Sequence, residues 1–95
     1  MAFLMTHFWP GGTDEQYRAT IGVVHPGGGK NLPKGQLHHF AGATEGGYLI
    51  SAIWDSPESA EEFVKTVLLP SMPVDGGFAG EPEERVAPIA NMQSA

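Results

Sequence analysis

The apolar residues of this chain fall into short periodic segments that glycine and proline separate. Residues 3–9 are rich in β-favouring aromatic side chains and end at a Pro-Gly-Gly turn, so they are predicted to form a strand. The sequence Thr-Asp-Glu-Gln at 13–16 has the form of a capping box, which begins a helix. That helix has to end by His25, because proline and three glycines follow. Its apolar side carries Tyr17, Ile21 and Val24.

Two further strands are predicted at 36–43 and 48–55, joined by a Thr-Glu-Gly-Gly hairpin turn. A turn of two or four residues pairs position 43 with 48, 41 with 50, 39 with 52 and 37 with 54. This register assigns the side chains to two sheet faces. One face is predicted to carry Leu37, His39, Ala41, Tyr48, Ile50, Ala52 and Trp54. The other is predicted to carry His38, Phe40, Gly42, Leu49, Ser51 and Ile53.

A second helix is predicted to begin at Ser56, an N-cap residue followed by a proline in the first turn. Pro70 and Pro73 end this helix, and a Gly/Pro/acid connection follows at 71–84. Residues 85–92 are predicted to form a last strand, at a sheet edge because it contains a proline. The apolar side of the helix carries Ala60, Phe63, Val64, Val67 and Leu68.

The predicted order of elements is β-α-β-β-α-β over residues 1–95. This is the pattern of a single α+β domain with the ferredoxin-like fold, in which an antiparallel sheet has the strand order 4-1-3-2. Two helices cover only one face of such a sheet. The other face, with Phe40, Leu49 and Ile53, is too apolar to stay exposed, so we expect a second copy of the chain to cover it in a homodimer.

The sequence from position 47 to 70 resembles a known family. The strand Gly-Tyr-Leu-Ile-Ser-Ala-Ile-Trp-Asp-Ser at 47–56, then Glu-Ser at 58–59, Phe63 and Leu-Leu-Pro at 68–70, are similar to the dimeric α+β barrel superfamily, in particular its antibiotic-biosynthesis-monooxygenase type. The resemblance implies two ferredoxin-like protomers packed sheet to sheet, each with a small-molecule cavity between its sheet and its helices. The superfamily includes cofactor-free monooxygenases of aromatic polyketides, polyketide cyclases, haem-degrading enzymes and isomerases.

Charge and composition exclude several partners. Five Lys and Arg against eleven Asp and Glu leave a net charge of −6, which disfavours nucleic acid. The chain has no Cys, so disulfides and thiolate sites are excluded and a reducing, cytoplasmic location is expected. No apolar run is long enough for a membrane span, and the apolar N-terminus lacks the basic start of a signal peptide.

The histidines are the first candidates for chemistry, because an imidazole titrates near neutral pH. His38 and His39 are adjacent on a strand and therefore point to opposite faces. His39 shares the helix-covered face, where it is either a pocket base or a core histidine. His25 is interpreted as a cationic cap at the helix C-terminus.

A second group of candidates is expected at one mouth of the cavity. Strand order 4-1-3-2 brings the end of the first strand, with His7 and Trp9, toward Tyr48 and Arg85. In the catalytic interpretation His39 or His7 removes a proton, while Tyr48 and Arg85 stabilise an enolate. In the alternative, the aromatic residues are core residues. The residues predicted to bind a small apolar or aromatic ligand are Trp9, Trp54, Ile50, Ala52, Tyr17 and Phe63.

No cofactor or metal is predicted. His7 and His39 lie two strand spacings apart, too far for one metal, and the acidic side chains at 81–84 are interpreted as solvated. The Gly-Gly-Gly-Lys sequence at 27–30 follows a helix and lacks phosphate-loop spacing. Three functions stay open: a cofactor-free oxygenase or cyclase, a non-catalytic ligand-binding or interaction protein, and a haem protein that would need His25 to face the cavity.

Overall fold

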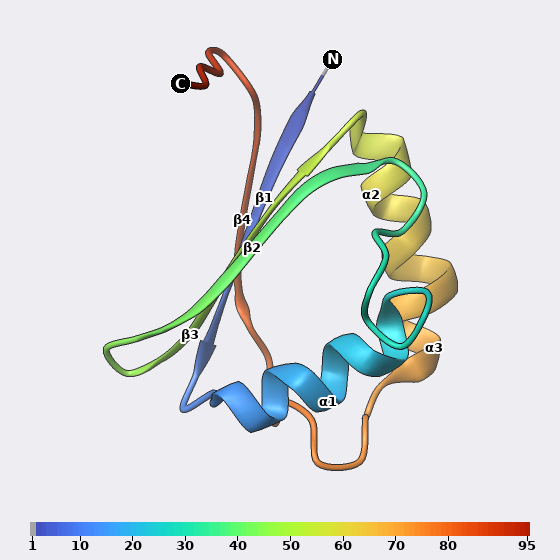
Figure 1. Ribbon diagram of the computed structural model, residues 1–95, viewed down its shortest axis with the longest axis vertical. Helices are drawn as coiled ribbons and strands as arrows, with labels where there is room; N and C mark the ends of the chain where they lie inside the picture. Colours follow the sequence, from blue (N-terminus) through green and yellow to red (C-terminus); the bar gives the residue numbers. More distant parts are fainter. Residues whose placement is uncertain (1) are drawn as a thin grey trace.

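The computed structural model describes residues 2–95, and its elements follow one another in the predicted order (Figure 1). They are β1 (Phe3–Pro10), α1 (Asp14–Val24), β2 (Gln36–Thr44), β3 (Gly47–Trp54), α2 (Pro57–Phe63), the π-helical segment η1 (Val64–Leu68), α3 (Leu69–Ser71) and β4 (Glu83–Pro88). The sheet order is β2-β3-β1-β4, with every neighbouring pair antiparallel. The predicted ferredoxin-like α+β fold is confirmed.

Both predicted helix starts are confirmed. The Thr13 hydroxyl accepts a hydrogen bond from the Gln16 backbone N–H at 3.2 Å, and the Gln16 side chain accepts one from the Thr13 N–H at 3.1 Å. At α2, the Ser56 hydroxyl accepts from the Ser59 N–H at 3.2 Å. Each bond pairs a backbone donor that the first helical turn leaves free.

The β2–β3 hairpin has the predicted register over most of its length, including His39 opposite Ala52. Near its open end a bulge falls between Gln36 and His38, so Gln36, not Leu37, pairs with Trp54. The expected place of Leu37 on the helix-covered face is therefore wrong. One extra residue in a strand exchanges the faces of the residues before it. Gln36 is buried as a result, whereas Leu37 is exposed.

The second helix is not regular throughout. After α2 the chain forms one π-helical stretch, in which the Leu69 N–H donates to the Val64 carbonyl five residues earlier. A π turn is wider than an α turn and shifts the side chains that follow it around the helix axis. Val64 and Leu68, the two ends of this stretch, both line the cavity described below.

The last strand begins and ends earlier than predicted, at Glu83 and Pro88 instead of 85 and 92. Proline has no N–H to continue a ladder. The next residue, Ile89, donates to the Ala2 carbonyl at 3.0 Å, outside any strand. β4 is an edge strand beside β1, as its proline predicted.

All helices lie on one face of the sheet (Figure 1), and the core between them has two clusters. One contains Met5, Ala52, Trp54 and Ala60, and the other contains Trp9, Tyr48 and Phe78. The opposite face carries apolar side chains that are uncovered, with Phe40 60% and Leu49 44% exposed. The chain alone therefore leaves an apolar sheet surface in water.

Candidate functional site

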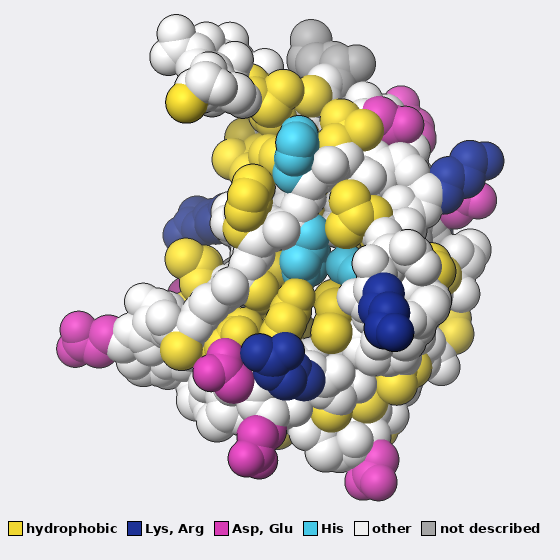
Figure 2. Space-filling view, in the orientation of Figure 1, with side chains coloured by type: hydrophobic (Ala, Val, Ile, Leu, Met, Phe, Trp, Pro, Cys, Tyr) yellow, Lys and Arg dark blue, Asp and Glu magenta, His cyan; other side chains and the backbone are white. Residues whose placement is uncertain are grey.

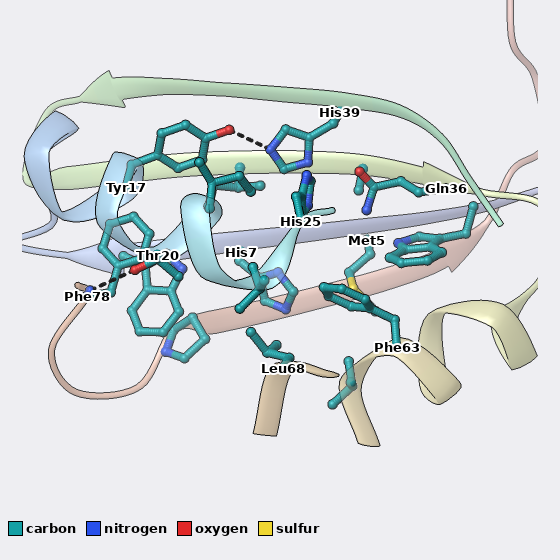
Figure 3. A pocket seen from close by; sticks show the side chains of 18 residues that line it. Met5, His7, Tyr17, Thr20, His25, Gln36, His39, Phe63, Leu68 and Phe78 are labelled. Carbon is teal, nitrogen blue, oxygen red and sulfur yellow. Dashed lines mark hydrogen bonds between the residues drawn. The ribbon is translucent and has the colours of Figure 1, made fainter. Parts of the chain in front are cut away.

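An apolar cavity of about 80 Å³ lies between the two core clusters, under α1 and the second helix, and opens to solvent. Figure 3 shows Tyr17, His39 and Gln36 along one side of it, His25 next to His39, and Phe63 and Leu68 opposite. In the space-filling view, imidazoles gather beside a hollow at the centre of one face (Figure 2). The lining residues are Met5, His7, Trp9, Tyr17, Thr20, Ile21, Val24, His25, Gln36, His39, Ile50, Ala52, Trp54, Phe63, Val64, Leu68, Phe78 and Pro82.

Two of the three lining histidines form a contact pair. The ring of His25, from the end of α1, meets the ring of His39, from β2, edge to face with centroids 4.7 Å apart. His39 Nε2 is hydrogen-bonded to the Tyr17 hydroxyl at 2.8 Å. Residues of α1 and of its C-terminal end therefore contact His39 twice, through the Tyr17 hydroxyl and through the His25 ring.

Both histidines of this pair favour the neutral form. Burial and, to a smaller extent, repulsion from His39 lower the pKa of His25 to about 4. Burial also lowers the pKa of His39 and raises the pKa of Tyr17. His25 does occupy the C-terminal end of α1, but it is buried and neutral, so its interpretation as a cationic cap is wrong.

His7 is the third lining histidine and has a different partner. Its Nε2 lies 2.8 Å from the Glu84 carboxylate, across the β1–β4 ladder. The His7 side chain is 16% exposed, and that of Glu84 is 52% exposed. His7 therefore stands between the cavity and solvent, paired with a carboxylate that the sequence interpretation had assigned to a solvated run.

Tyr48 does not line the cavity. It is buried behind Tyr17, with ring centroids 5.1 Å apart, and its hydroxyl donates to the Asp14 carboxylate at 2.6 Å. Burial and this hydrogen bond raise the pKa of Tyr48 to about 12. Trp9 stacks on Phe78 with centroids 4.6 Å apart. For Tyr48 the geometry matches the core alternative, whereas Trp9 is both a core residue and a lining residue.

Arg85 also lies elsewhere. It pairs with Thr6 in the β1–β4 ladder, whereas the adjacent Glu84 pairs with His7. Adjacent strand residues point to opposite faces, so Arg85 projects from the uncovered face. Its expected place at the cavity mouth is wrong, because the register of β4 against β1 puts Glu84, and not Arg85, on the same sheet face as His7.

Three polar atoms near the cavity are buried without a hydrogen-bond partner within residues 2–95: Gln36 Oε1, His39 Nδ1 and Trp54 Nε1. Burying such an atom unpaired is unfavourable, and a ligand that pairs it recovers the cost. An indole N–H can only donate and an amide oxygen can only accept, so the site offers both kinds of hydrogen bond.

Most of the predicted site residues line the cavity. Of the ten predicted site residues, those that line the cavity are His7, His39, Trp9, Tyr17, Ile50, Ala52, Trp54 and Phe63. Sequence reasoning missed His25 as a lining residue, although it lies eight positions after Tyr17 and so on the same side of the helix. It also missed Gln36 and Phe78, which line the cavity, and Glu84, which pairs with His7; no local signal exists for these three.

In the part of the chain that the structure describes, no three His, Asp or Glu side chains are grouped so as to hold a metal ion. None of its helices combines the length and apolarity needed to cross a bilayer.

Two solved structures share this architecture over nearly the whole chain. One is a Chloroflexus aurantiacus J-10-fl protein provisionally assigned as an antibiotic biosynthesis monooxygenase, with a TM-score of 0.65 and 15% identity over 98% of each chain. The other is a mutant of SnoaB, a cofactor-independent oxygenase from Streptomyces nogalater, with a TM-score of 0.61 and 10% identity over 96% of this chain and 94% of SnoaB. This chain has the fold of the antibiotic biosynthesis monooxygenases. No family model and no curated protein matches its sequence, so the reaction has to be argued from the cavity.

Proposed function

We propose that this protein binds a small aromatic molecule in the cavity and acts on it as a cofactor-independent oxygenase or cyclase-type enzyme. The observation that carries the proposal is an apolar cavity lined by three imidazoles, one of them paired with a carboxylate. An apolar wall with few polar groups is typical of small-molecule sites. The likeness in fold to a cofactor-independent oxygenase supports the reaction class.

The chemistry needs a base more than it needs a redox group. A histidine removes a proton from a carbon that neighbouring aromatic rings or carbonyls acidify. The resulting carbanion reduces O₂, so that a CH₂ group and O₂ become a ketone and water. Because burial lowers the pKa of His25 and His39, those two bases are weakened, and we assign proton removal to His7.

The size of the cavity limits the ligand. A volume of about 80 Å³ is well below the several hundred Å³ of sites that enclose drug-sized molecules, so the enclosed part of a ligand is at most one aromatic ring. Since the cavity opens to solvent, the rest of a fused-ring substrate extends through the mouth.

The same proposal includes a homodimer through the uncovered sheet face. Phe40 and Leu49 on that face are large, apolar and exposed, and Leu4, Phe8 and Ile53 are half-buried there. A second protomer that packs against this face removes the apolar surface from water and stabilises a small domain.

Haem is a poorer fit. His25 does face the cavity, which was the requirement for this alternative. However, its ring is packed against His39 and Phe63, and about 80 Å³ is far too little for a porphyrin. A non-catalytic binding protein would use the same cavity but would not convert its ligand. Only a turnover measurement distinguishes this function from that of an enzyme.

Calorimetric titration with 1-naphthol tests binding, and an oxygen electrode with 1,8-dihydroxyanthrone tests turnover. We expect saturable naphthol binding that Ala52→Phe abolishes, because the new ring fills the cavity. Val23→Phe, at an exposed position of α1, is the matched control and should bind normally. Binding without oxygen uptake above the uncatalysed rate would favour the non-catalytic protein, and binding unchanged by Ala52→Phe would refute the site.

A further inference from the structure

The pairing of His7 with Glu84 has a chemical consequence for which atom acts as the base. The two residues lie opposite each other in the β1–β4 ladder, and His7 Nε2 is 2.8 Å from a Glu84 carboxylate oxygen. A carboxylate only accepts hydrogen bonds. A neutral His7 in this pair therefore carries its proton on Nε2.

This tautomer leaves the lone pair on Nδ1. In the described chain no protein group forms a hydrogen bond with that nitrogen, and His7 lines the cavity. We infer that Glu84 is a positioning residue, which holds His7 as the Nε2–H tautomer so that Nδ1 takes the proton from a ligand in the cavity. This inference rests on the proposed function for its ligand, but the tautomer itself does not.

Glu84 also acts on the product of the proton transfer. When Nδ1 gains a proton, His7 becomes a cation with both ring N–H groups as donors. The carboxylate then faces a positive charge at hydrogen-bond distance, and the ion pair stabilises it. The same arrangement, in which a carboxylate orients an imidazole base, operates in hydrolytic triads.

The other lining histidines lack this arrangement. His39 Nε2 is hydrogen-bonded to a neutral phenol, Tyr17, and the His25 ring packs against the rings of His39 and Phe63. Neither has a carboxylate partner among the ion pairs of residues 2–95. Of the three imidazoles, only His7 is paired with a carboxylate among residues 2–95.

Nitrogen-15 NMR of the ligand-free protein at pH 9 tests the tautomer. We expect His7 to show a protonated Nε2, an unprotonated Nδ1 and a slowly exchanging Nε2–H resonance. The resonance should disappear in Glu84→Ala and persist in Glu81→Gln, which removes the same charge from an exposed residue. A proton on Nδ1, or a resonance that survives Glu84→Ala, would overturn the inference whatever the protein binds.

A second measurement tests the base with a probe that needs no other catalytic group. Removal of the C3 proton of 5-nitrobenzisoxazole breaks its N–O bond and releases a coloured cyanonitrophenolate. We expect His7→Ala to reduce the rate to the uncatalysed level and Glu84→Gln to reduce it about tenfold or more, whereas Glu81→Gln retains it. No rate above background in the wild type, or an unchanged rate in Glu84→Gln, would refute the assigned roles. Probe turnover without binding of naphthol or oxygenation of the anthrone would instead refute the proposed function alone.

Discussion

Replacing His25 by glutamine should reduce the acid sensitivity of the fold. His25 is 6% exposed and packs against the His39 ring, and its pKa is lowered to about 4. An unfolded histidine has a pKa near 6.5. Between these two values the unfolded state binds more protons than the folded state, so stability decreases as the pH falls through that window.

The size of the effect follows from the two pKa values. The stabilisation is complete above pH 6.5 and is lost as the pH falls toward 4. A histidine with these values makes folding about 2 kcal/mol less favourable at pH 5 than at pH 7, and about 3 kcal/mol less favourable at pH 4. Small domains have only about 5–15 kcal/mol of stability, so this loss is measurable.

Urea denaturation at a series of pH values between 4 and 7.5 measures it. Carboxylates also titrate in this range, and the His25→Gln variant contains all of them, so the difference between the two proteins isolates His25. We expect the wild type to lose about 2 kcal/mol more than the variant between pH 7 and pH 5. Parallel pH profiles would refute the reasoning, as would an NMR titration in which the His25 ring changes near pH 6.5. The NMR measurement needs only the wild type.

Three further predictions concern other parts of the fold. Tyr48→Phe should destabilise the protein by about 1 kcal/mol, because the hydrogen bond to Asp14 is lost. The variant should also lack, in an ultraviolet titration, the phenol that ionises near pH 12. Because an unfolded tyrosine ionises near pH 10, the wild type should become less stable as the pH rises from 10 to 12. Gly47→Ala should cost about 2 kcal/mol or more in urea denaturation, because its methyl group collides with a backbone carbonyl of β1. Gly22→Ala, in helix α1, should instead stabilise by about 0.5–1 kcal/mol, because its methyl group would meet only the Gly28 carbonyl oxygen, at an ordinary van der Waals distance of 3.8 Å. Phe40→Lys should convert the proposed dimer to a monomer in light scattering, whereas Leu69→Lys, equally exposed on the helical side, should leave it intact; a dimer in both variants would argue against the sheet-face interface.

The site combines two different environments for imidazole. Inside the cavity, His25 and His39 are desolvated and neutral, and at its edge His7 faces a half-exposed carboxylate. One fold thus holds two histidines inside an apolar pocket and a third beside a carboxylate.

Local signals explain why much of this protein was predictable. The Thr13 capping box, the Ser56 cap and the hairpin turn each depend on residues within four positions of one another. Such interactions depend on the local sequence alone, so the two helix starts and the hairpin could be predicted from it. The face of the hairpin that carries His39 follows as well, because side chains alternate along paired strands.

The identity of the polar groups at the cavity could not be predicted in the same way. Gln36 lines the cavity because a bulge near the start of β2 changes the sheet face on which its side chain lies. Glu84, and not Arg85, lies opposite His7 because of the register in which β4 pairs with β1. The residues of the His7–Glu84 pair are 77 positions apart in the chain. No short-range pattern specifies a contact between such distant residues.

The sequence by itself determined the fold class, the order of elements, the apolar sheet face and eight of the residues that line the cavity. Only the tertiary structure decided which imidazole has a carboxylate partner, which are buried as neutral rings, and which predicted residues lie outside the site. The physical reason is that a shift of one residue in strand pairing moves a side chain from one face of a sheet to the other. Whether a polar residue reaches the cavity therefore depends on pairing between distant strands.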